Sequence, residues 1–356
     1  MAMRISISKR VFNFAFKALT SRGVMKDKTS WFLRVEDDAF PGISGWGECG
    51  PLPGLSVDFS AGFGNSLAEL VSKINESFFN CNDEAKIRQI IPASFPSVLF
   101  GVETALMDLR NGGRRIIFQN SFCEGNPIPI NGLVWMGDIK FMMDQVNTKI
   151  SQGFSCIKLK VGGLDFDREC DILRYIRKKY SDNVVIRLDA NGAFKAADVL
   201  DKLNELAKFQ IHSIEQPIRP GLGEMAEVCR KSPIPVAFDE ELIGVFGRDA
   251  KVALIKKLKP QFIVLKPTLH GGLYGCDEWI SVAESMRVGW WITSALESSI
   301  GLNAICQFTA NYQPILPQGL GTGAIYTNNV VSPLGVRNGN IFWDPAGVWE
   351  ELYGHA

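Results

Sequence analysis

Six charged residues in the second half of the chain share one feature: each stands at or near the end of a short apolar segment. They are Lys158, Lys160, Asp189, Glu215, Asp239 and Lys266. The successive steps from Lys160 onward are 29, 26, 24 and 27 residues long, which is close to the length of one strand–helix unit. Because the carboxyl ends of parallel strands meet at one end of a barrel, we expect these side chains to lie close together.

The types of these residues predict a hard-cation site with bases beside it. Three carboxylates brought together would repel one another, and Mg²⁺, which prefers oxygen ligands, would relieve that repulsion. The only histidines are His212, His270 and His355, so a zinc hydrolase or a histidine-based triad has little support. A lysine next to a cation and a second lysine is more easily neutral and can then accept a proton. Any one of these carboxylates, taken alone, could equally be a solvated loop residue or a helix cap. The ordered set as a whole predicts proton transfer next to a metal-bound carboxylate.

The elements that must position these residues alternate between strand and helix from about residue 127 onward. Eight segments have the pattern of buried strands: Ile128–Trp135, Cys156–Val161, Val184–Asp189, Ser213–Gln216, Val236–Asp239, Phe262–Lys266, Trp290–Thr293 and Ile315–Leu320. Helical periodicity lies between most of them, as in Phe166–Lys179 and Ala196–Phe209. Eight such units in about 200 residues favour a closed α/β barrel of the (β/α)8 type. An open doubly wound sheet is the alternative, but Gly162-Gly163 does not match the glycine-rich phosphate turn of that fold.

The start of the chain predicts a small α+β unit that caps the barrel. Its expected elements are the strands Arg4–Phe16, Ser30–Glu36 and Gly42–Cys49 and the helix Asn65–Glu76, and a second helix, Ser97–Arg110, follows this unit. The polar residues Thr20–Thr29 are expected to form a long hairpin loop. We predict a capping domain over residues 1–95, completed by residues 330–356, and a catalytic barrel over residues 96–329.

The charge balance argues against nucleic acid and membrane partners. Lysine plus arginine and aspartate plus glutamate both total 38, so no overall positive field would gather nucleic acid or anionic lipid. The uncharged stretch from Ser298 to Val336 contains three prolines and many polar residues, which a membrane-spanning helix would not tolerate. Eight scattered cysteines without C-x-x-C spacing predict reduced thiols in a cytoplasmic protein.

The ordered set of charges resembles the enolase superfamily. Lys-x-Lys, then Asp, Glu and Asp on three successive strands, then Lys on the next, is similar to its muconate lactonising subgroup, which has lysines on both sides of the site. The resemblance extends from Gly45-Trp46-Gly47-Glu48 to Gly319-Leu320-Gly321, which is nearly the whole chain. Within the subgroup the sequence looks most like the o-succinylbenzoate synthase family, in the segments Arg187–Asn191, Ser294–Leu302 and Gln318–Thr322.

The resemblance implies a fold, a cofactor and a reaction. The fold would be a barrel modified as (β/α)7β under an N-terminal α+β capping domain. The reaction would be the syn dehydration of 2-succinyl-6-hydroxy-2,4-cyclohexadiene-1-carboxylate, a small-molecule carboxylate, in menaquinone synthesis. Asp189, Glu215 and Asp239 would bind Mg²⁺, for which Mn²⁺ could substitute. The metal would bind the substrate's carboxylate and stabilise the enediolate that forms when the α-proton leaves.

The same resemblance implies roles for the lysines and their neighbours. Lys160 would take the α-proton and help the hydroxyl to leave as water, while Lys266 on the opposite side would stay protonated and Lys158 would assist Lys160. The expected substrate-binding residues are Arg187, Asn191, Thr293, Ser294 and Gly319. The Thr20–Thr29 and Gly50–Ser56 loops would close over the mouth of the barrel and exclude water.

Other functions on the same residues remain open at this point. Racemisation of N-acylamino acids, epimerisation of dipeptides and muconate cycloisomerisation would use the same metal ligands and lysines. Dipeptide epimerases carry Asp-x-Asp after the last barrel strand, whereas this chain has Gly321-Thr322-Gly323. A non-catalytic barrel that binds a diacid is a rival of a different class. The sequence predicts no particular oligomeric state.

Overall fold

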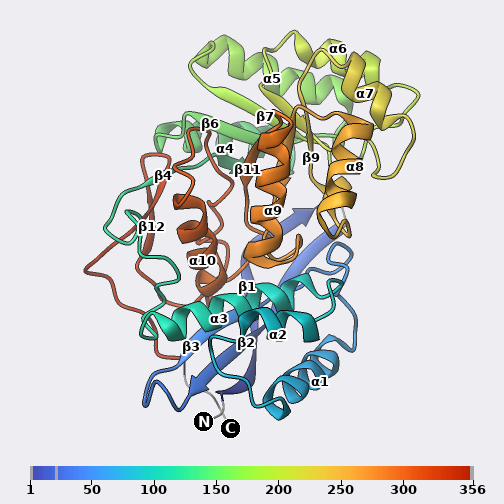
Figure 1. The fold of residues 1–356 in the computed structure, drawn as a ribbon. Helices are drawn as coiled ribbons and strands as arrows, with labels where there is room; N and C mark the ends of the chain where they lie inside the picture. The colour runs from blue at the N-terminus through green and yellow to red at the C-terminus, as the bar shows by residue number, and fades with distance from the viewer. Residues whose placement is uncertain (1–2, 21–22, 353–356) are drawn as a thin grey trace.

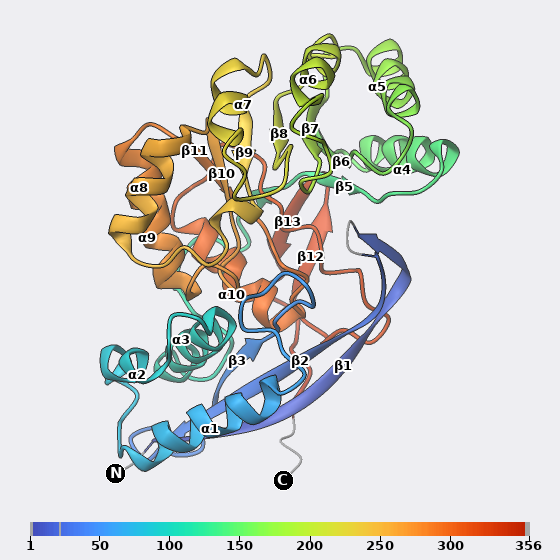
Figure 2. The ribbon, with the colours of Figure 1, turned by 90° about the vertical axis from the view of Figure 1, so that its right-hand side faces the viewer.

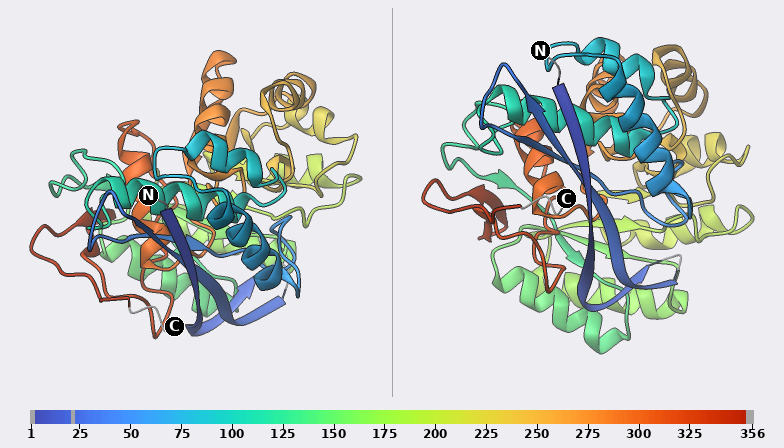
Figure 3. Two further views of the ribbon diagram at one scale, coloured as in Figure 1. Left: turned by 60° about the horizontal axis from the view of Figure 1, so that its bottom comes forward. Right: turned by 90° about the horizontal axis from the view of Figure 1, so that it is seen from below.

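The computed structural model describes residues 3–20 and 23–352. The N-terminal part is a three-stranded antiparallel sheet, in the order β1-β2-β3, followed by three helices. The strands are β1 (Met3–Thr20), β2 (Gly23–Asp37) and β3 (Gly45–Cys49), and the helices are α1 (Phe63–Glu76), α2 (Glu84–Ile90) and α3 (Pro96–Arg110). Figure 1 shows this unit at one end of the molecule, and Figure 3 shows β1 and β2 crossing beneath the rest of the chain.

The prediction of a long loop over Thr20–Thr29 is wrong. Strands β1 and β2 pair from Met3 opposite Asp37 to Thr20 opposite Gly23, so only residues 21 and 22, which lie outside the described residues, separate them. The residues from Gly23 to Asp27 are mostly exposed, so strand pairing here comes from the backbone rather than from an apolar face. Figure 2 shows the far end of this hairpin rising along the side of the barrel.

The second part is a parallel sheet of seven strands in the order β11-β10-β9-β8-β7-β6-β5. Its strands are β5 (Gly132–Val134), β6 (Cys156–Lys160), β7 (Val185–Asp189), β8 (Ser213–Glu215), β9 (Val236–Phe238), β10 (Phe262–Leu265) and β11 (Gly289–Ile292). The helices that follow them are α4 (Ile139–Ser151), α5 (Phe166–Tyr180), α6 (Val199–Ala207), α7 (Met225–Lys231), α8 (Arg248–Leu258), α9 (Gly272–Ser285) and α10 (Ser299–Ala310). A short 3-10 helix, η1 (Glu240–Leu242), follows β9 directly.

The eighth predicted strand closes the sheet into a barrel, although it is shorter than expected. Of the predicted segment Ile315–Leu320, only Gln318 and Gly319 form parallel bridges, to Ile130 on one side and Thr293 on the other. Since the preceding Pro317 has no N–H to donate, regular pairing cannot extend further back. No helix follows this segment in the described part of the chain, so the predicted (β/α)7β barrel with its N-terminal capping sheet is confirmed.

Helix α3 contacts both parts of the molecule. Helix α3 packs on β3 and also on the barrel helix α9. Its contact with β3 requires glycine at position 47, because a Cβ atom there would collide with the carbonyl oxygen of Gly101. Near the C-terminus, β12 (Leu334–Arg337) and β13 (Asn340–Trp343) form a hairpin that pairs with the short strand β4 (Ile128–Pro129).

The predicted domain limits, with a boundary after residue 95 and residues 330–356 assigned to the capping unit, remain predictions. The last of these residues, 353–356, lie outside the described residues. Within residues 3–20 and 23–352, no helix has both the length and the apolar composition needed to cross a membrane.

Candidate active site

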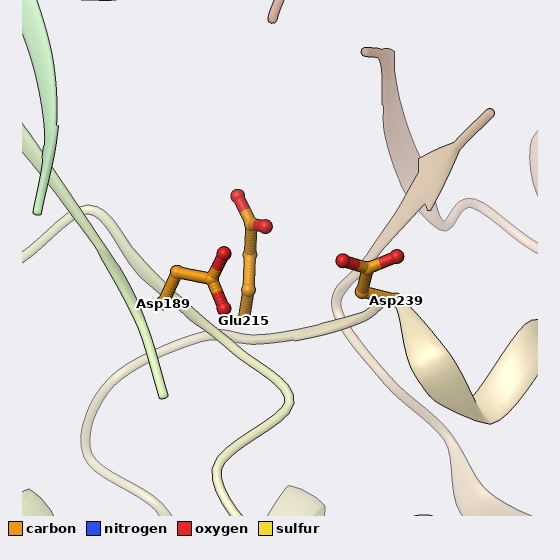
Figure 4. A group of neighbouring side chains, drawn as sticks. All are labelled: Asp189, Glu215 and Asp239. Carbon is orange, nitrogen blue, oxygen red and sulfur yellow. The ribbon is translucent and has the colours of Figure 1, made fainter. Parts of the chain in front are cut away.

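The three acidic residues singled out in the sequence come together at the carboxyl ends of β7, β8 and β9. In the sheet, Lys160 lies opposite Asp189 and Asp189 lies opposite Glu215, so neighbouring strands present their charges at one level. One carboxylate oxygen from each of Asp189, Glu215 and Asp239 lies within 4.8 Å of the others, and all three residues are buried. Figure 4 shows the three carboxylates gathered around a common space.

The lysines flank this carboxylate cluster on both sides. Asp189 Oδ2 accepts hydrogen bonds from Lys158 Nζ at 2.8 Å and from Lys160 Nζ at 2.7 Å. Lys158 also donates to Glu215 Oε2, and Lys266 donates to both carboxylate oxygens of Asp239. In the barrel order, two lysines therefore precede the three acids and one follows them, as the sequence predicted.

Burial and neighbouring charges shift the pKa values of Asp189 and Glu215 in opposite directions. Burial raises the pKa of Glu215 to about 7; Lys158 opposes this rise, while Asp189 and Asp239 add to it. Burial also acts to raise the pKa of Asp189, but Lys158 and Lys160 outweigh it and hold that pKa well below its usual range. For Lys158, burial favours the neutral amine, yet the surrounding carboxylates outweigh burial and raise its pKa. Of these two acids, Glu215 is therefore the one that is more easily protonated near neutral pH.

This cluster fits a divalent cation by two independent criteria. All of its donors are carboxylate oxygens, the ligand type that Mg²⁺ and other hard cations prefer. The second carboxylate oxygen of Glu215, Oε1, is buried and has no hydrogen-bond partner in the described structure. A buried acceptor without a partner is costly, and a coordinated cation would satisfy it.

Asn191 links the lysines to a fourth acid. Its Oδ1 accepts a hydrogen bond of 2.6 Å from Lys160 Nζ, and its Nδ2 donates one of 2.9 Å to Glu240 Oε1. Its φ of 44° lies in the left-handed region, which asparagine tolerates better than most residues. Burial raises the pKa of Glu240, and Asp239 beside it adds to the rise. Asn191 therefore orients Lys160.

One pocket contains the lysines and two of the three acids, and it also reaches the capping unit. It is lined by Leu52, Leu55, Asn131, Leu133, Trp135, Lys158, Lys160, Asp189, Asn191, Asp239, Glu240, Lys266, Thr293, Ser294, Ala295, Leu296, Gly319, Gly321 and Thr322. The expected substrate-binding residues Asn191, Thr293, Ser294 and Gly319 all belong to this lining. Leu52 and Leu55 come from the predicted Gly50–Ser56 loop, so that loop does contribute to the pocket.

Away from the charged end, the wall is apolar or neutral. Ser294 Oγ and Thr322 Oγ1 share a hydrogen bond of 2.6 Å, and each hydroxyl keeps further capacity to bind a ligand. Charged lining residues occur only near the carboxylate cluster. The pocket is therefore suited to a molecule with a carboxylate at one end and an apolar or weakly polar body.

Arg187 does not lie where substrate contact was expected. It points to the same barrel interior as Asp189, but two residues earlier on the strand and so about 7 Å deeper. Its guanidinium is fully buried, donates to the carbonyl of Pro317 at 2.7 Å, and lies over the Trp291 ring at 4.1 Å. It is absent from the pocket lining, so the geometry gives it a place in the barrel core beneath the site.

Eight lining residues were not among the site residues expected from the sequence: Asn131, Leu133, Trp135, Glu240, Ala295, Leu296, Gly321 and Thr322. A simple signal existed for Glu240, which directly follows Asp239, and for Trp135, which was predicted as the last residue of the first barrel strand. No local signal marked Asn131. Thr322 belongs to the Gly321-Thr322-Gly323 stretch, which the sequence marked only by its lack of Asp-x-Asp.

Comparison with known proteins agrees with this architecture. Residues 142–343 match the family described as Enolase C-terminal domain-like. The chain is 41% identical to the o-succinylbenzoate synthase of Desulfotalea psychrophila over 95% of its own length and 98% of the relative.

Solved structures give the same result for the fold. A crystal structure of MenC from Desulfotalea psychrophila LSv54 superposes with a TM-score of 0.86 at 39% identity, covering 96% of this chain and all of that one. A dipeptide epimerase from Enterococcus faecalis V583, in complex with Mg and L-Leu-L-Tyr, superposes with a TM-score of 0.85 at 20% identity, over 98% of each chain. The second likeness concerns the fold alone. The chain belongs to the enolase superfamily and, within it, to the o-succinylbenzoate synthase family.

Proposed function

We propose that this protein is a hydro-lyase that converts 2-succinyl-6-hydroxy-2,4-cyclohexadiene-1-carboxylate to 2-succinylbenzoate and water, and so serves menaquinone synthesis. The observation that carries the proposal is the 41% identity to an o-succinylbenzoate synthase over 95% of the chain. The geometry is compatible with it, since Lys160 and Lys266 flank a buried carboxylate cluster within a single pocket.

The reaction requires one group that accepts a proton and later returns it. Lys160, as a neutral amine, would take the proton from the ring carbon that bears the carboxylate, and the C–H electron pair would pass into that carboxylate. When the hydroxyl leaves the neighbouring carbon, the electron pair returns to form the ring double bond, and the Lys160 ammonium supplies the proton that completes water. Atoms and charge balance, and Lys160 ends as it began.

Asn191 and Lys158 would support this proton transfer. The hydrogen bond of 2.6 Å from Lys160 to Asn191 Oδ1 fixes the amine at the edge of the pocket. Lys158, held by Asp189 and Glu215, keeps a positive charge beside Lys160. That charge would assist the proton transfer electrostatically.

Lys266 would hold a fixed positive charge on the opposite side. Its ammonium is bound to Asp239 and is nearly buried, so its charge acts in a medium of low dielectric constant. It would oppose the negative charge that develops on the substrate after the α-proton leaves.

We propose that Asp189, Glu215 and Asp239 hold Mg²⁺, with Mn²⁺ as a substitute. The bound cation would supply Lewis-acid stabilisation of the substrate carboxylate. A cytoplasmic location is also proposed, because all eight cysteines are free thiols and seven of them are buried.

Racemisation or epimerisation is the second candidate, because lysines on both sides of a substrate could deliver a proton to either face. The pocket wall weakens the dipeptide version. Gly321 and Thr322 line the wall after the last strand, and neither offers a carboxylate to a substrate ammonium group. Muconate cycloisomerisation and simple diacid binding use the same residues and are separated by assay.

The test is a spectrophotometric assay of the purified protein with the cyclohexadiene carboxylate, an N-succinylamino acid, a dipeptide and muconate. We expect turnover of the first substrate that stops in EDTA and returns with MgCl2 or MnCl2. Dipeptide or muconate turnover without dehydration would replace this proposal with one of the alternatives. Absence of turnover on every substrate would favour a binding protein.

A further inference from the structure

One wall of the pocket is held in place by the capping sheet. Leu296 lines the pocket, and its φ of 62° is unusual for a residue with a branched side chain. Its carbonyl oxygen accepts two hydrogen bonds, from Lys28 Nζ at 2.8 Å and from Tyr326 OH at 2.6 Å. The backbone strain at this position needs external support, and these two donors provide it.

Lys28 reaches this carbonyl from the middle of β2. Only 2% of the residue is exposed, so its ammonium is removed from water and needs partners of opposite charge. Glu48 Oε1, from the neighbouring strand β3, lies 3.9 Å from Lys28 Nζ. The charged pair is therefore built entirely from the capping sheet, while the carbonyl that it holds belongs to the barrel.

Glu48 fixes the other end of the same loop. Its carboxylate accepts hydrogen bonds from the backbone N–H of Ser298 at 3.0 Å, from Ser298 Oγ at 2.6 Å and from the N–H of Gly301 at 3.0 Å. These donors lie at the start of α10, where a negative charge is favourable. The loop between β11 and α10 is thus attached to the capping sheet at both its middle and its end.

Contacts within the barrel complete the enclosure of this loop. Glu297 Oε1 accepts from Thr268 Oγ1 at 2.6 Å, and Oε2 accepts from the N–H of Ala295 at 2.7 Å. The Leu296 side chain packs with Leu52 and with its other apolar neighbours. The conformation of this loop therefore determines the position of Ala295 and Leu296, which line the pocket next to Ser294.

We infer that Lys28 and Tyr326 are positioning residues that set the shape of the substrate pocket through the Leu296 carbonyl. They do not line the pocket themselves. The inference deepens the proposed function and rests on it for the identity of the substrate. Because two donors share one acceptor, either donor alone keeps the carbonyl satisfied, and only the loss of both releases the loop.

The test compares Lys28→Met, Tyr326→Phe and the double variant with the parent. Lys26→Met is the matched control, since Lys26 lies two residues away on β2 and is exposed. For each single variant we expect KM for the cyclohexadiene carboxylate to rise by about threefold, and for the double variant by about thirtyfold or more, beyond the product of the two. The turnover number and the Mg²⁺ affinity should change by less than about threefold, because the lysines and acids of the site keep their contacts.

Amide hydrogen exchange provides a readout that needs no substrate. Exchange in the segment 294–298 should accelerate in the double variant and stay at the parental rate in Lys26→Met. Tyr326→Phe removes a single hydroxyl. If Lys28→Met folds poorly, the threefold rise in KM of Tyr326→Phe relative to Lys26→Met still tests the contact with the Leu296 carbonyl.

Equal KM values in all folded variants, or unchanged exchange of this segment in the double variant, would overturn the inference. Failure of the proposed function looks different: the parent itself would neither turn over the substrate nor bind 2-succinylbenzoate in calorimetry with MgCl2. In that case the exchange experiment still decides whether the two donors hold the loop.

Discussion

The affinity for Mg²⁺ should fall steeply as the pH drops below neutrality, and the cause is Glu215. Burial raises the pKa of this carboxyl to about 7, with Asp189 and Asp239 adding to the effect. Below that pH the metal-free protein holds a proton on Glu215, and a cation must displace this proton before the carboxylate can bind it. Above it, the carboxylate is already ionised and binding carries no proton cost.

The size of the effect follows from the linkage between proton and metal binding. With a pKa of about 7, the apparent Kd is larger than its limiting value by a factor of about 11 at pH 6 and about 1.1 at pH 8. The affinity should therefore differ about tenfold between these conditions, which is about 1.4 kcal/mol. At pH 7, binding of one cation should release about half a proton.

Isothermal titration of MgCl2 into EDTA-treated and dialysed protein measures both quantities. Titrations at pH 6 and pH 8, in two buffers with different ionisation enthalpies, give the Kd and the number of protons released. Glu103→Gln is the matched control, because burial also raises the pKa of that carboxyl to about 7 but the residue lies outside the pocket. It should keep the tenfold difference, whereas Glu215→Gln should weaken binding and abolish the pH dependence. Equal Kd values at the two pH values, without proton release, would refute this reasoning.

Two further predictions concern stability. Burial, and then the charge of Lys266, lower the pKa of His270 to about 3. As the pH falls from about 6.5 towards 3, the unfolded chain therefore binds a proton at this residue while the folded chain does not, and the folded state loses stability. Between pH 8 and pH 5.5, the unfolding free energy of His270→Asn, measured by urea denaturation, should fall by about 1.4 kcal/mol less than that of the parent. The same fall in both proteins would contradict this prediction. Gly47→Ala should destabilise the folded protein by about 3 kcal/mol, because the new Cβ would collide with the backbone of Gly101. Gly223→Ala, which meets open space, should stay within about 0.5 kcal/mol of the parent, and similar losses for both variants would argue against the collision.

The positions of the acidic cluster and of the lysines could be predicted from sequence because two simple rules apply to them. A strand's period of two places Lys158 and Lys160 on one face, and regular spacing places Asp189, Glu215 and Asp239 at the ends of successive strands. Together these rules predict which way each side chain points and at which end of its strand it lies, so the grouping of these residues can be predicted from the sequence.

Other features depend on information that is not local. Arg187 obeys the same period of two, but its depth along the strand decides whether the side chain reaches the pocket or the core. Its core partner, Trp291, is more than a hundred residues later in the sequence, so no local pattern predicts that contact. The β1–β2 hairpin continues through polar residues because its far end is exposed, which an apolar pattern cannot reveal. The contact of Lys28 with the Leu296 carbonyl joins residues 268 positions apart through a backbone atom, which no side-chain pattern encodes.

We propose above all that Lys160 moves the substrate proton beside the carboxylate cluster. Turnover of the cyclohexadiene carboxylate by Lys160→Ala, with MgCl2 present and Mg²⁺ affinity measured in parallel, tests it most directly. Loss of a general base predicts a fall in the turnover number of about a thousandfold, with the Kd for Mg²⁺ changed little because Lys158 still binds Asp189. A variant that keeps more than about a tenth of the parental rate, while its metal affinity is intact, would contradict the assignment.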